Sequence, residues 1–416
     1  TPGEYLEYFR LAQHTTLGYA GIMAIGEFLN LRGVVGVMLV NLVITAVAVV
    51  YLYRMLAGFF GNMSKTKAAV GAGVALLVPL FWGTFGYFQP DYGTCIFAIF
   101  TMYFDYKKKP ILFFFWAVML TQSKEVGIVV LAGYMGARLI YGIASHKGTA
   151  AQRIGAQLRD PINWCAVGSA AVFGLYSIIN GGATTWMRYP GDTAAAKFTW
   201  SNTGTNCFGF QPDYIFARLK QMLVTNYSWL LCILIVIALI VFFVKKARRR
   251  QTSYNGRGLT CLFGAMGGFT LMNCLFITEG LYRYNVIFAV FLWVMAYIGI
   301  IEVFGTKKIP YVAIVSVIGV LFSLQTFTST DPVSNALVET MDTGNGRMLV
   351  MRRGDNAGIV FGDCIVYNYQ YNQVNKALDD MLEDSGLEED SGVLYSRGSS
   401  IMSQLEGGAY YKAYWS

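Results

Sequence analysis

Charge is what this sequence has least of. Among its 416 residues only 13% are Asp, Glu, Lys or Arg, whereas 55% are hydrophobic, and the mean hydropathy is +0.46. A soluble chain carries about 25% charged residues. The composition therefore excludes an ordinary water-soluble domain over most of the length, and much of the chain is expected to be solvated by lipid.

Histidine and the common catalytic motifs are also scarce. The two histidines, His14 and His146, fall on opposite faces of the topology derived below, so no Ser/His/Asp or Cys/His arrangement can be argued. Dinucleotide, P-loop and HExxH motifs are absent, as are internal repeats. The seven cysteines show no CxxC or His/Cys spacing that predicts a metal site. Cys207 and Cys364 could pair if both are extracytoplasmic, but two cysteines do not establish a disulfide framework.

The positive charge that is present falls into short clusters after every second hydrophobic segment. The intervening connections are nearly free of Lys and Arg, which is the positive-inside pattern of a polytopic membrane protein. It assigns the clusters to the cytoplasm and the polar connections between them to the other face. The clusters are Arg54/Lys65/Lys67, Lys107–Lys109, Arg138/Lys147/Arg153/Arg159, Lys245–Arg257 and Lys307/Lys308.

Ten apolar segments lie between or beside these clusters, and a hydrocarbon core of roughly 30 Å needs about 20 helical residues. Ile111–Gln122 is short, but fusing it with the next segment would leave Lys124 and Glu125 near mid-membrane, at roughly 2.5–3.5 kcal/mol each. We therefore predict ten spans, with both ends outside. The segments are Gly33–Tyr53, Ala68–Phe88, Tyr92–Tyr106, Ile111–Gln122, Val126–Ile143, Ile162–Ile179, Tyr227–Val244, Gly258–Thr278, Tyr284–Phe304 and Pro310–Phe327.

The two ends differ from this apolar domain, which covers 33–327 and includes an outer loop at 181–225. Because the chain begins at Thr1 without Met, we expect a first transmembrane helix to precede it. Residues 1–32 would then be the end of the first outer loop and an interfacial helix. From Asp331 the sequence has 13 acidic and 6 basic residues, and 328–416 reads as a small extracytoplasmic α/β segment. Its strand-like pieces are Met348–Met351 and Ile359–Phe361, followed by a helix-like Tyr371–Glu383.

The most specific stretch is Pro90–Val130, "PDYGTCIFAIFTMYFDYKKKPILFFFWAVMLTQSKEVGIVV". A Pro-Asp opens one short span, and Ser-Lys-Glu-Xaa-Gly closes the next. This resembles the GT-C superfamily of membrane glycosyltransferases. "GLYRYNVIFAVFLWV" (Gly280–Val294) is similar to its Arg-Tyr helix start near the lipid-phosphate site, and "EYLEYFRLAQHTTLGYA" (Glu4–Ala20) to the end of its first outer loop. The resemblance covers Glu4–Phe327. The family's catalytic carboxylate usually lies close after the first span, where this chain begins.

The resemblance implies transfer of a sugar from a polyprenyl-phosphate donor to a glycan, lipid or protein acceptor, on the extracytoplasmic face of a bacterial cell membrane. One carboxylate would act as general base, and cations would neutralise the departing phosphate. The catalytic candidates are Glu4, Glu7 and Asp91. The candidates for substrate binding are His14, Lys124, Glu125, Arg188, Arg283 and Tyr284. A divalent cation is one cofactor to consider, but no motif indicates it, and no metal ligand is assigned.

Each candidate also has a purely structural interpretation. Asp91 can stabilise a helix N-terminus, and Lys124–Glu125 can be a hairpin turn with snorkelling side chains. Arg283 and Tyr284 can be interfacial anchors, whereas Arg218 and Lys220 are expected to meet lipid headgroups. Glu4 and Glu7 can be solvated surface carboxylates, and His14 a polar residue at a helix start.

Other functions stay open. A transporter or flippase of a lipid-linked solute would show broken helices and charges at mid-span, and a polysaccharide polymerase or ligase would share the phosphate-binding Arg. A non-enzymatic scaffold would leave the polar outer turns unexplained. The part before Asp331 carries a net charge of about +15, which anionic lipid accounts for, so nucleic acid is not an expected partner.

Overall fold

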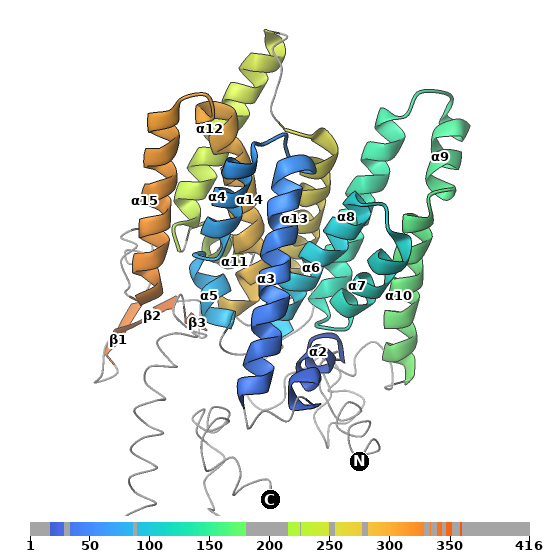
Figure 1. Cartoon of the computed structure of the whole chain (residues 1–416), viewed down its shortest axis with the longest axis horizontal. Helices are drawn as coiled ribbons and strands as arrows, with labels where there is room; N and C mark the ends of the chain where they lie inside the picture. Colours follow the sequence, from blue (N-terminus) through green and yellow to red (C-terminus); the bar gives the residue numbers. More distant parts are fainter. Residues whose placement is uncertain are drawn as a thin grey trace, which may run out of the picture.

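The computed structural model describes residues 17–28, 34–85, 90–179, 215–224, 226–248, 254–276 and 282–327, together with 333, 339–342, 347–351 and 358–359. Within these residues each predicted apolar segment is mostly helical, and one of them is divided between two helices (Figure 1). The helices are α2 Leu17–Phe28, α3 Val34–Gly58, α4 Lys65–Ala75, α5 Pro79–Phe85, α6 Pro90–Tyr106, α7 Pro110–Thr121, α8 Val126–Ser145, α9 Ala150–Leu158, α10 Pro161–Ile179, α11 Ile215–Leu223, α12 Ser228–Ala247, α13 Gly256–Phe276, the 3-10 helix η4 Tyr282–Asn285, α14 Val286–Phe304 and α15 Lys308–Phe327.

Some of these helices are both long and apolar enough to cross a membrane. There are 5 among the described residues: Val35–Gly58, Val126–Ser145, Ser228–Lys245, Gly256–Phe276 and Val286–Phe304. The fold is therefore that of a helical membrane protein. Helices suit a membrane because they satisfy their own backbone hydrogen bonds where no water is available.

One predicted span is wrong in detail. The segment Ala68–Phe88 is not one helix: α4 ends at Ala75, and α5 begins at Pro79. Between them the N–H groups of Leu76, Leu77 and Val78 bond to carbonyls three residues earlier, at 2.9–3.3 Å. Proline has no N–H and clashes with a preceding helical turn, so it suits the first turn of a new helix.

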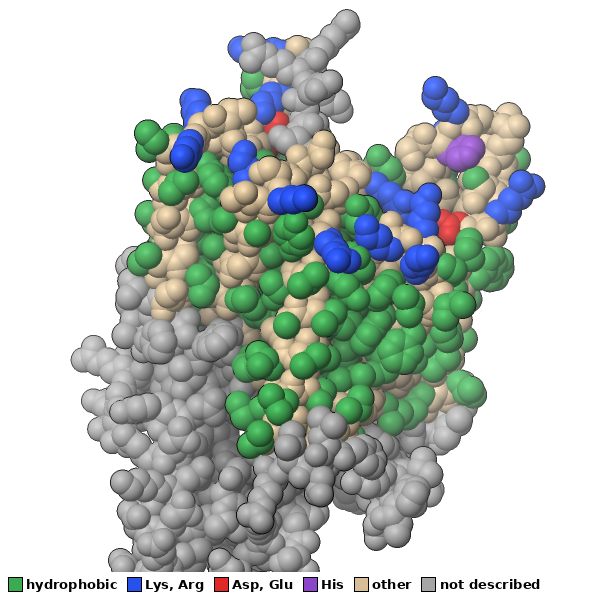
Figure 2. Space-filling model, viewed as in Figure 1, with side chains coloured by type: hydrophobic (Ala, Val, Ile, Leu, Met, Phe, Trp, Pro, Cys, Tyr) green, Lys and Arg blue, Asp and Glu red, His purple; other side chains and the backbone are tan. Residues whose placement is uncertain are grey.

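Basic side chains gather at one end of the bundle. The α8–α9 and α14–α15 connections lie at this end, whereas α2 and the short strands lie at the other (Figure 1). The visible surface shows Lys and Arg concentrated above a broad apolar band (Figure 2). We call the Lys- and Arg-rich end the basic end, and the end holding α2 the opposite end.

The most extensive helix pair, α8 with α13, depends on glycine. A Cβ at Gly133 would lie 2.2 Å from the Gly264 carbonyl oxygen, and a Cβ at Gly264 would lie 2.3 Å from the Gly133 carbonyl oxygen. Small residues let membrane helices approach this closely, and close approach increases their van der Waals contact.

Helix α14 occupies the centre of the bundle. Trp293 and Tyr297 are fully buried, and the Trp293 indole donates to the Gly71 carbonyl at 2.9 Å. The Tyr297 hydroxyl donates to the Lys67 carbonyl and pairs with the Tyr311 hydroxyl at 2.6 Å. These bonds tie α14 to α4 and α15.

The described part of the C-terminal segment is a small antiparallel sheet in the order β1 Glu339–Asp342, β2 Arg347–Met351, β3 Gly358–Ile359. Glu339 pairs with Val350, and Val350 with Ile359. Strands β2 and β3 overlap the two predicted strand-like pieces. The helix-like Tyr371–Glu383 lies outside the described residues.

Candidate functional site

Asp91 and Lys124 meet at the opposite end of the bundle. Asp91 is the second residue of α6, and Lys124 lies in the tight turn between α7 and α8. The Lys124 Nζ donates to Asp91 Oδ1 at 2.6 Å, and the two side chains are 13% and 6% exposed. The helix α6 N-terminus also favours a carboxylate. A charged pair with this little solvent is held in a defined geometry.

A third segment completes this cluster. The Lys124 Nζ lies 3.6 Å from the centroid of the Tyr284 ring, in η4, which leads into α14. An aromatic face attracts an ammonium, the more so where water is excluded. Arg283 lies in the same 3-10 turn, but its side chain is outside the described part. We call Asp91, Lys124 and Tyr284 the acid–lysine–tyrosine cluster.

Two further polar residues lie in the same turn as Lys124. Glu125 is 5% exposed and lies within electrostatic range of Tyr176 on α10. Gln122 is 4% exposed, and neither of its side-chain amide atoms has a hydrogen-bond partner among the described residues. Its backbone carbonyl accepts the Gly18 N–H at 2.8 Å, which joins α2 to this turn. The turn is therefore buried and polar.

A buried hydrogen-bond network lies beside Asp91. Tyr19 on α2 donates to Asn41 Oδ1 at 3.0 Å, and Asn41 donates to the Phe85 carbonyl at 2.8 Å. Tyr92, the neighbour of Asp91, pairs with the Thr45 hydroxyl at 2.7 Å. These bonds connect α2, α3, α5 and α6, and so they fix the start of α6.

Other predicted site residues are not placed or are placed differently. Glu4, Glu7, His14 and Arg188 lie outside the described residues, as do Cys207 and Cys364. The prediction for Arg218 is wrong: its side chain is 1% exposed, not at lipid headgroups. The amphipathic helix α11 packs on α13 and turns Arg218 inward, whereas Lys220 is exposed. Among the described residues no group of three or more His, Cys, Asp or Glu side chains is arranged to hold a metal ion.

Sequence reasoning missed an ionic cluster at the basic end. Asp105 is fully buried at the end of α6 and accepts from Arg138 Nε at 3.0 Å, Arg257 Nη2 at 3.0 Å and the Tyr134 hydroxyl at 2.7 Å. Arg138 also donates to Asp160 Oδ2 at 2.6 Å. An acidic residue ending an apolar span was the available signal. The cluster joins α6, α8, α13 and the start of α10.

Asp160 shows how this cluster stabilises charge. Its partial burial opposes ionisation, but the hydrogen bond and positive charge of Arg138 outweigh that effect and hold the pKa of the Asp160 carboxyl below its usual 3.8. The carboxylate is therefore ionised at neutral pH, and Arg138 has two buried or half-buried anionic partners.

Comparison of the chain with protein-family models, with curated proteins and with solved structures yields no match.

Proposed function

We propose that this protein is a membrane glycosyltransferase that moves a sugar from a polyprenyl-phosphate donor to an acceptor on the extracytoplasmic face. The observation that carries the proposal is the convergence of Asp91, Lys124 and Tyr284, which come from two of the stretches that resemble GT-C sequences. The cluster lies at the end of the bundle opposite the basic end, as a site on the outer face requires.

The proposal includes a ten-span topology with the basic end in the cytoplasm. Helices α3, α4 with α5, α6, α7, α8, α10, α12, α13, α14 and α15 would cross in turn, and α7 would cross despite its 12 residues. Helix α7 packs against α6 and α10, and local thinning of the bilayer can match a short helix. The C-terminal sheet would lie outside the cell.

The cluster offers the two groups that sugar transfer needs. An acceptor hydroxyl must lose a proton, and Asp91 would take it as general base. The donor phosphate leaves with its charge increased, and Lys124 would neutralise that charge. In the free protein Lys124 is paired with Asp91. Donor phosphate would compete for the ammonium, and the Asp91 carboxylate would accept the proton of the acceptor hydroxyl.

Neighbouring residues would supply the rest of the site. Arg283 follows Tyr282 and precedes Tyr284, so its backbone lies beside the cluster, and a guanidinium binds phosphate with two parallel hydrogen bonds. The amide of Gln122 is buried near Lys124, where a sugar hydroxyl would satisfy it. Glu4, Glu7, His14, Glu125 and Arg188 stay candidates for acceptor and donor binding.

The test uses membranes containing the full chain and a panel of synthetic polyprenyl-phosphate hexoses and pentoses, with transfer followed by radiolabel. Lys124→Met should lower the turnover at least a hundredfold, the scale on which a positioned charge acts, and Asp91→Asn should abolish it. Arg283→Ala should be severe, and Arg283→Lys should restore only part. The matched control is Lys220→Met, an exposed lysine in α11. Equal transfer by wild type and Lys124→Met, at matched expression, would refute the role of the cluster.

One observation favours a second candidate, a transporter or flippase of a lipid-linked solute. The break between α4 and α5 before Pro79 is of the kind that transporters use at a substrate site. Such a protein would move an intact polyprenyl-phosphate sugar across reconstituted vesicles without cleaving the sugar–phosphate bond. Recovery of uncleaved donor on the far side, with no transfer product, would favour this alternative.

A further inference from the structure

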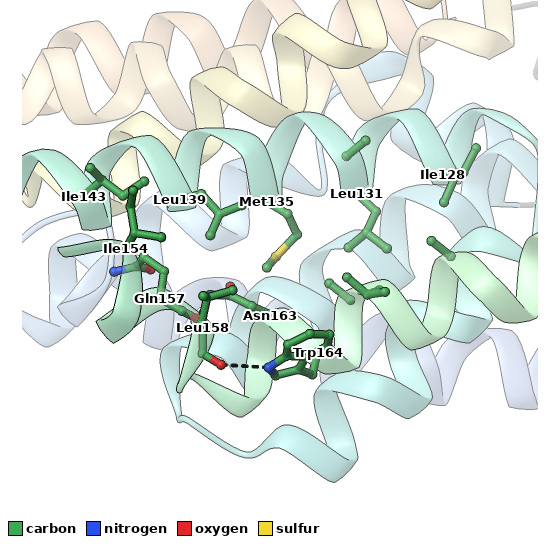
Figure 3. Close-up of a pocket in the computed structure, with 14 residues that line it drawn as sticks. Ile128, Leu131, Met135, Leu139, Ile143, Ile154, Gln157, Leu158, Asn163 and Trp164 are labelled. Atoms are coloured by element: carbon green, nitrogen blue, oxygen red, sulfur yellow. Dashed lines mark hydrogen bonds between the residues drawn. The ribbon is translucent and has the colours of Figure 1, made fainter. Parts of the chain in front are cut away.

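An apolar groove opens on the side of the bundle between α8 and α10. Its cavity volume is about 400 Å³, and its lining is almost entirely hydrocarbon (Figure 3). Cavities of about 300–1,000 Å³ hold small organic ligands. Helices α8, α9 and α10 supply the lining, which includes Leu131, Met135 and Leu139 of α8 and Trp164, Ala166 and Val167 of α10.

The groove has the length and direction of a lipid chain. On α8 its lining runs from Ile128 to Ile143, which is roughly 22 Å at 1.5 Å per residue. That is more than half of a hydrocarbon core of roughly 30 Å. The groove therefore lies along the helices rather than across them, and its walls Leu158, Trp164 and Val167 are each 59% exposed at its open side.

Helix α9 closes the groove at the basic end. Ile154 and Leu158 line it, and the Trp164 indole donates to the Leu158 carbonyl at 2.7 Å (Figure 3). Asn163 donates to the Gln157 carbonyl at 2.7 Å and keeps the start of α10 against α9. Side-chain hydrogen bonds to backbone carbonyls therefore hold this end of the groove together, whereas the rest of the groove is apolar.

The segment of the chain at the closed end is basic. The segment 139–159 contains Lys147, Arg153 and Arg159 and no acidic residue. Lys147 follows α8 closely, Arg159 directly follows the lining residue Leu158, and both are exposed. The adjacent Asp160 is paired with Arg138 and does not offset them. A ligand with a long apolar chain and an anionic head would match both parts.

We infer that this groove binds one anionic glycerophospholipid, with an acyl chain between α8 and α10 and its phosphate beside Lys147 and Arg159. The bound lipid would cover apolar side chains that packing within the bundle leaves open, and each buried methylene contributes favourably. The inference does not depend on the glycosyltransferase proposal, because the acid–lysine–tyrosine cluster lies at the other end of the bundle.

The test is native mass spectrometry of the full chain, purified in detergent, with added phosphatidylglycerol or phosphatidylcholine of identical acyl chains. Wild type should bind phosphatidylglycerol roughly tenfold more tightly than phosphatidylcholine, since each basic residue near an anionic lipid headgroup adds to the binding free energy. Lys147→Gln/Arg159→Gln should remove that preference. The control Lys307→Gln/Lys308→Gln alters two exposed basic residues at the start of α15 and should keep that preference.

Two adjacent alanines on α10 test the groove itself. Both are exposed, but only Ala170 lines the groove. Ala170→Phe should weaken binding of both lipids at least tenfold, whereas Ala171→Phe should leave it unchanged. Ala132→Phe obstructs the groove from α8 and gives an independent reading if Ala170→Phe unfolds. Equal binding of the two lipids by wild type, or undiminished binding by a folded Ala170→Phe or Ala132→Phe protein, would overturn the inference.

Discussion

The buried Asp105 carboxylate provides the sharpest test of what holds the bundle together. It is fully buried, and it accepts hydrogen bonds from two arginine side chains and one tyrosine hydroxyl on α8 and α13. The change Asp105→Asn keeps the size of the side chain and an acceptor for Tyr134 but removes the negative charge. Any loss of stability would therefore report the ionic interaction rather than a cavity.

The expected magnitude follows from the burial of each partner. Removing one member of a buried ion pair costs about 3–5 kcal/mol, because it leaves a desolvated charge behind. Arg138 is 5% exposed but keeps Asp160, and Arg257 is 31% exposed and can regain water. We therefore expect the lower end of that range, about 3 kcal/mol, for Asp105→Asn.

The assay is reversible unfolding of the detergent-solubilised protein, with the midpoint and slope of the denaturant curve measured for each variant. Asp160→Asn is the matched control. It is 33% exposed, so its pair should contribute no more than about 1 kcal/mol. In the double variant Asp105→Asn/Arg138→Met the effects should not add, since the two side chains interact directly. A loss below about 0.5 kcal/mol for Asp105→Asn, the range of an ordinary surface change, would refute the reasoning.

Three further predictions concern other contacts. Gly264→Leu should destabilise the protein by at least about 2 kcal/mol in the same denaturation assay, because a side chain there meets the backbone of α8. Trp293→Phe should cost about 1–3 kcal/mol by removing the buried indole hydrogen bond to the Gly71 carbonyl. The pKa of Asp160 is lowered, so its contribution is present above its unfolded value near 3.8 and is lost as the pH falls through the lower folded value. The difference in melting temperature between wild type and Asp160→Asn should therefore hold at pH 5–7 and shrink below about pH 4.

The sequence predicted the helices well because apolar runs and charge clusters are local signals. Apart from Ala68–Phe88, each predicted apolar segment largely coincides with helix among the described residues, and basic residues gather at one end (Figure 2). The prediction of a single helix over Ala68–Phe88 was wrong because a hydropathy average does not register a short break. Pro79 was the local signal of that break. Hydropathy also gives no information about rotation, so it could not predict that Arg218 turns into the bundle.

The candidate site was only partly accessible for a similar reason. Motif similarity selected Asp91, Lys124 and Tyr284 one at a time, each with a structural alternative. Their contacts at 2.6 Å and 3.6 Å depend on how α6, α7 and α14 pack, which spacing does not encode. Asp105 was overlooked because it lies next to the Lys107–Lys109 cluster, where the sequence predicts a solvated cytoplasmic turn. Only packing shows that it is buried.

Helices α12 and α14 are both strongly apolar, yet 11% of the residues in the α12 membrane window are buried, compared with 89% for α14. The same composition therefore meets two different requirements. A position on α12 mostly faces lipid hydrocarbon and should accept any apolar side chain. Over evolutionary time, Leu, Ile, Val and Phe should replace one another freely there. A position on α14 must fit its neighbours in shape. If α12 were replaced by random apolar sequences, most members of the library should therefore still fold. If α14 were replaced in the same way, few should fold, although a hydropathy plot would score all members alike.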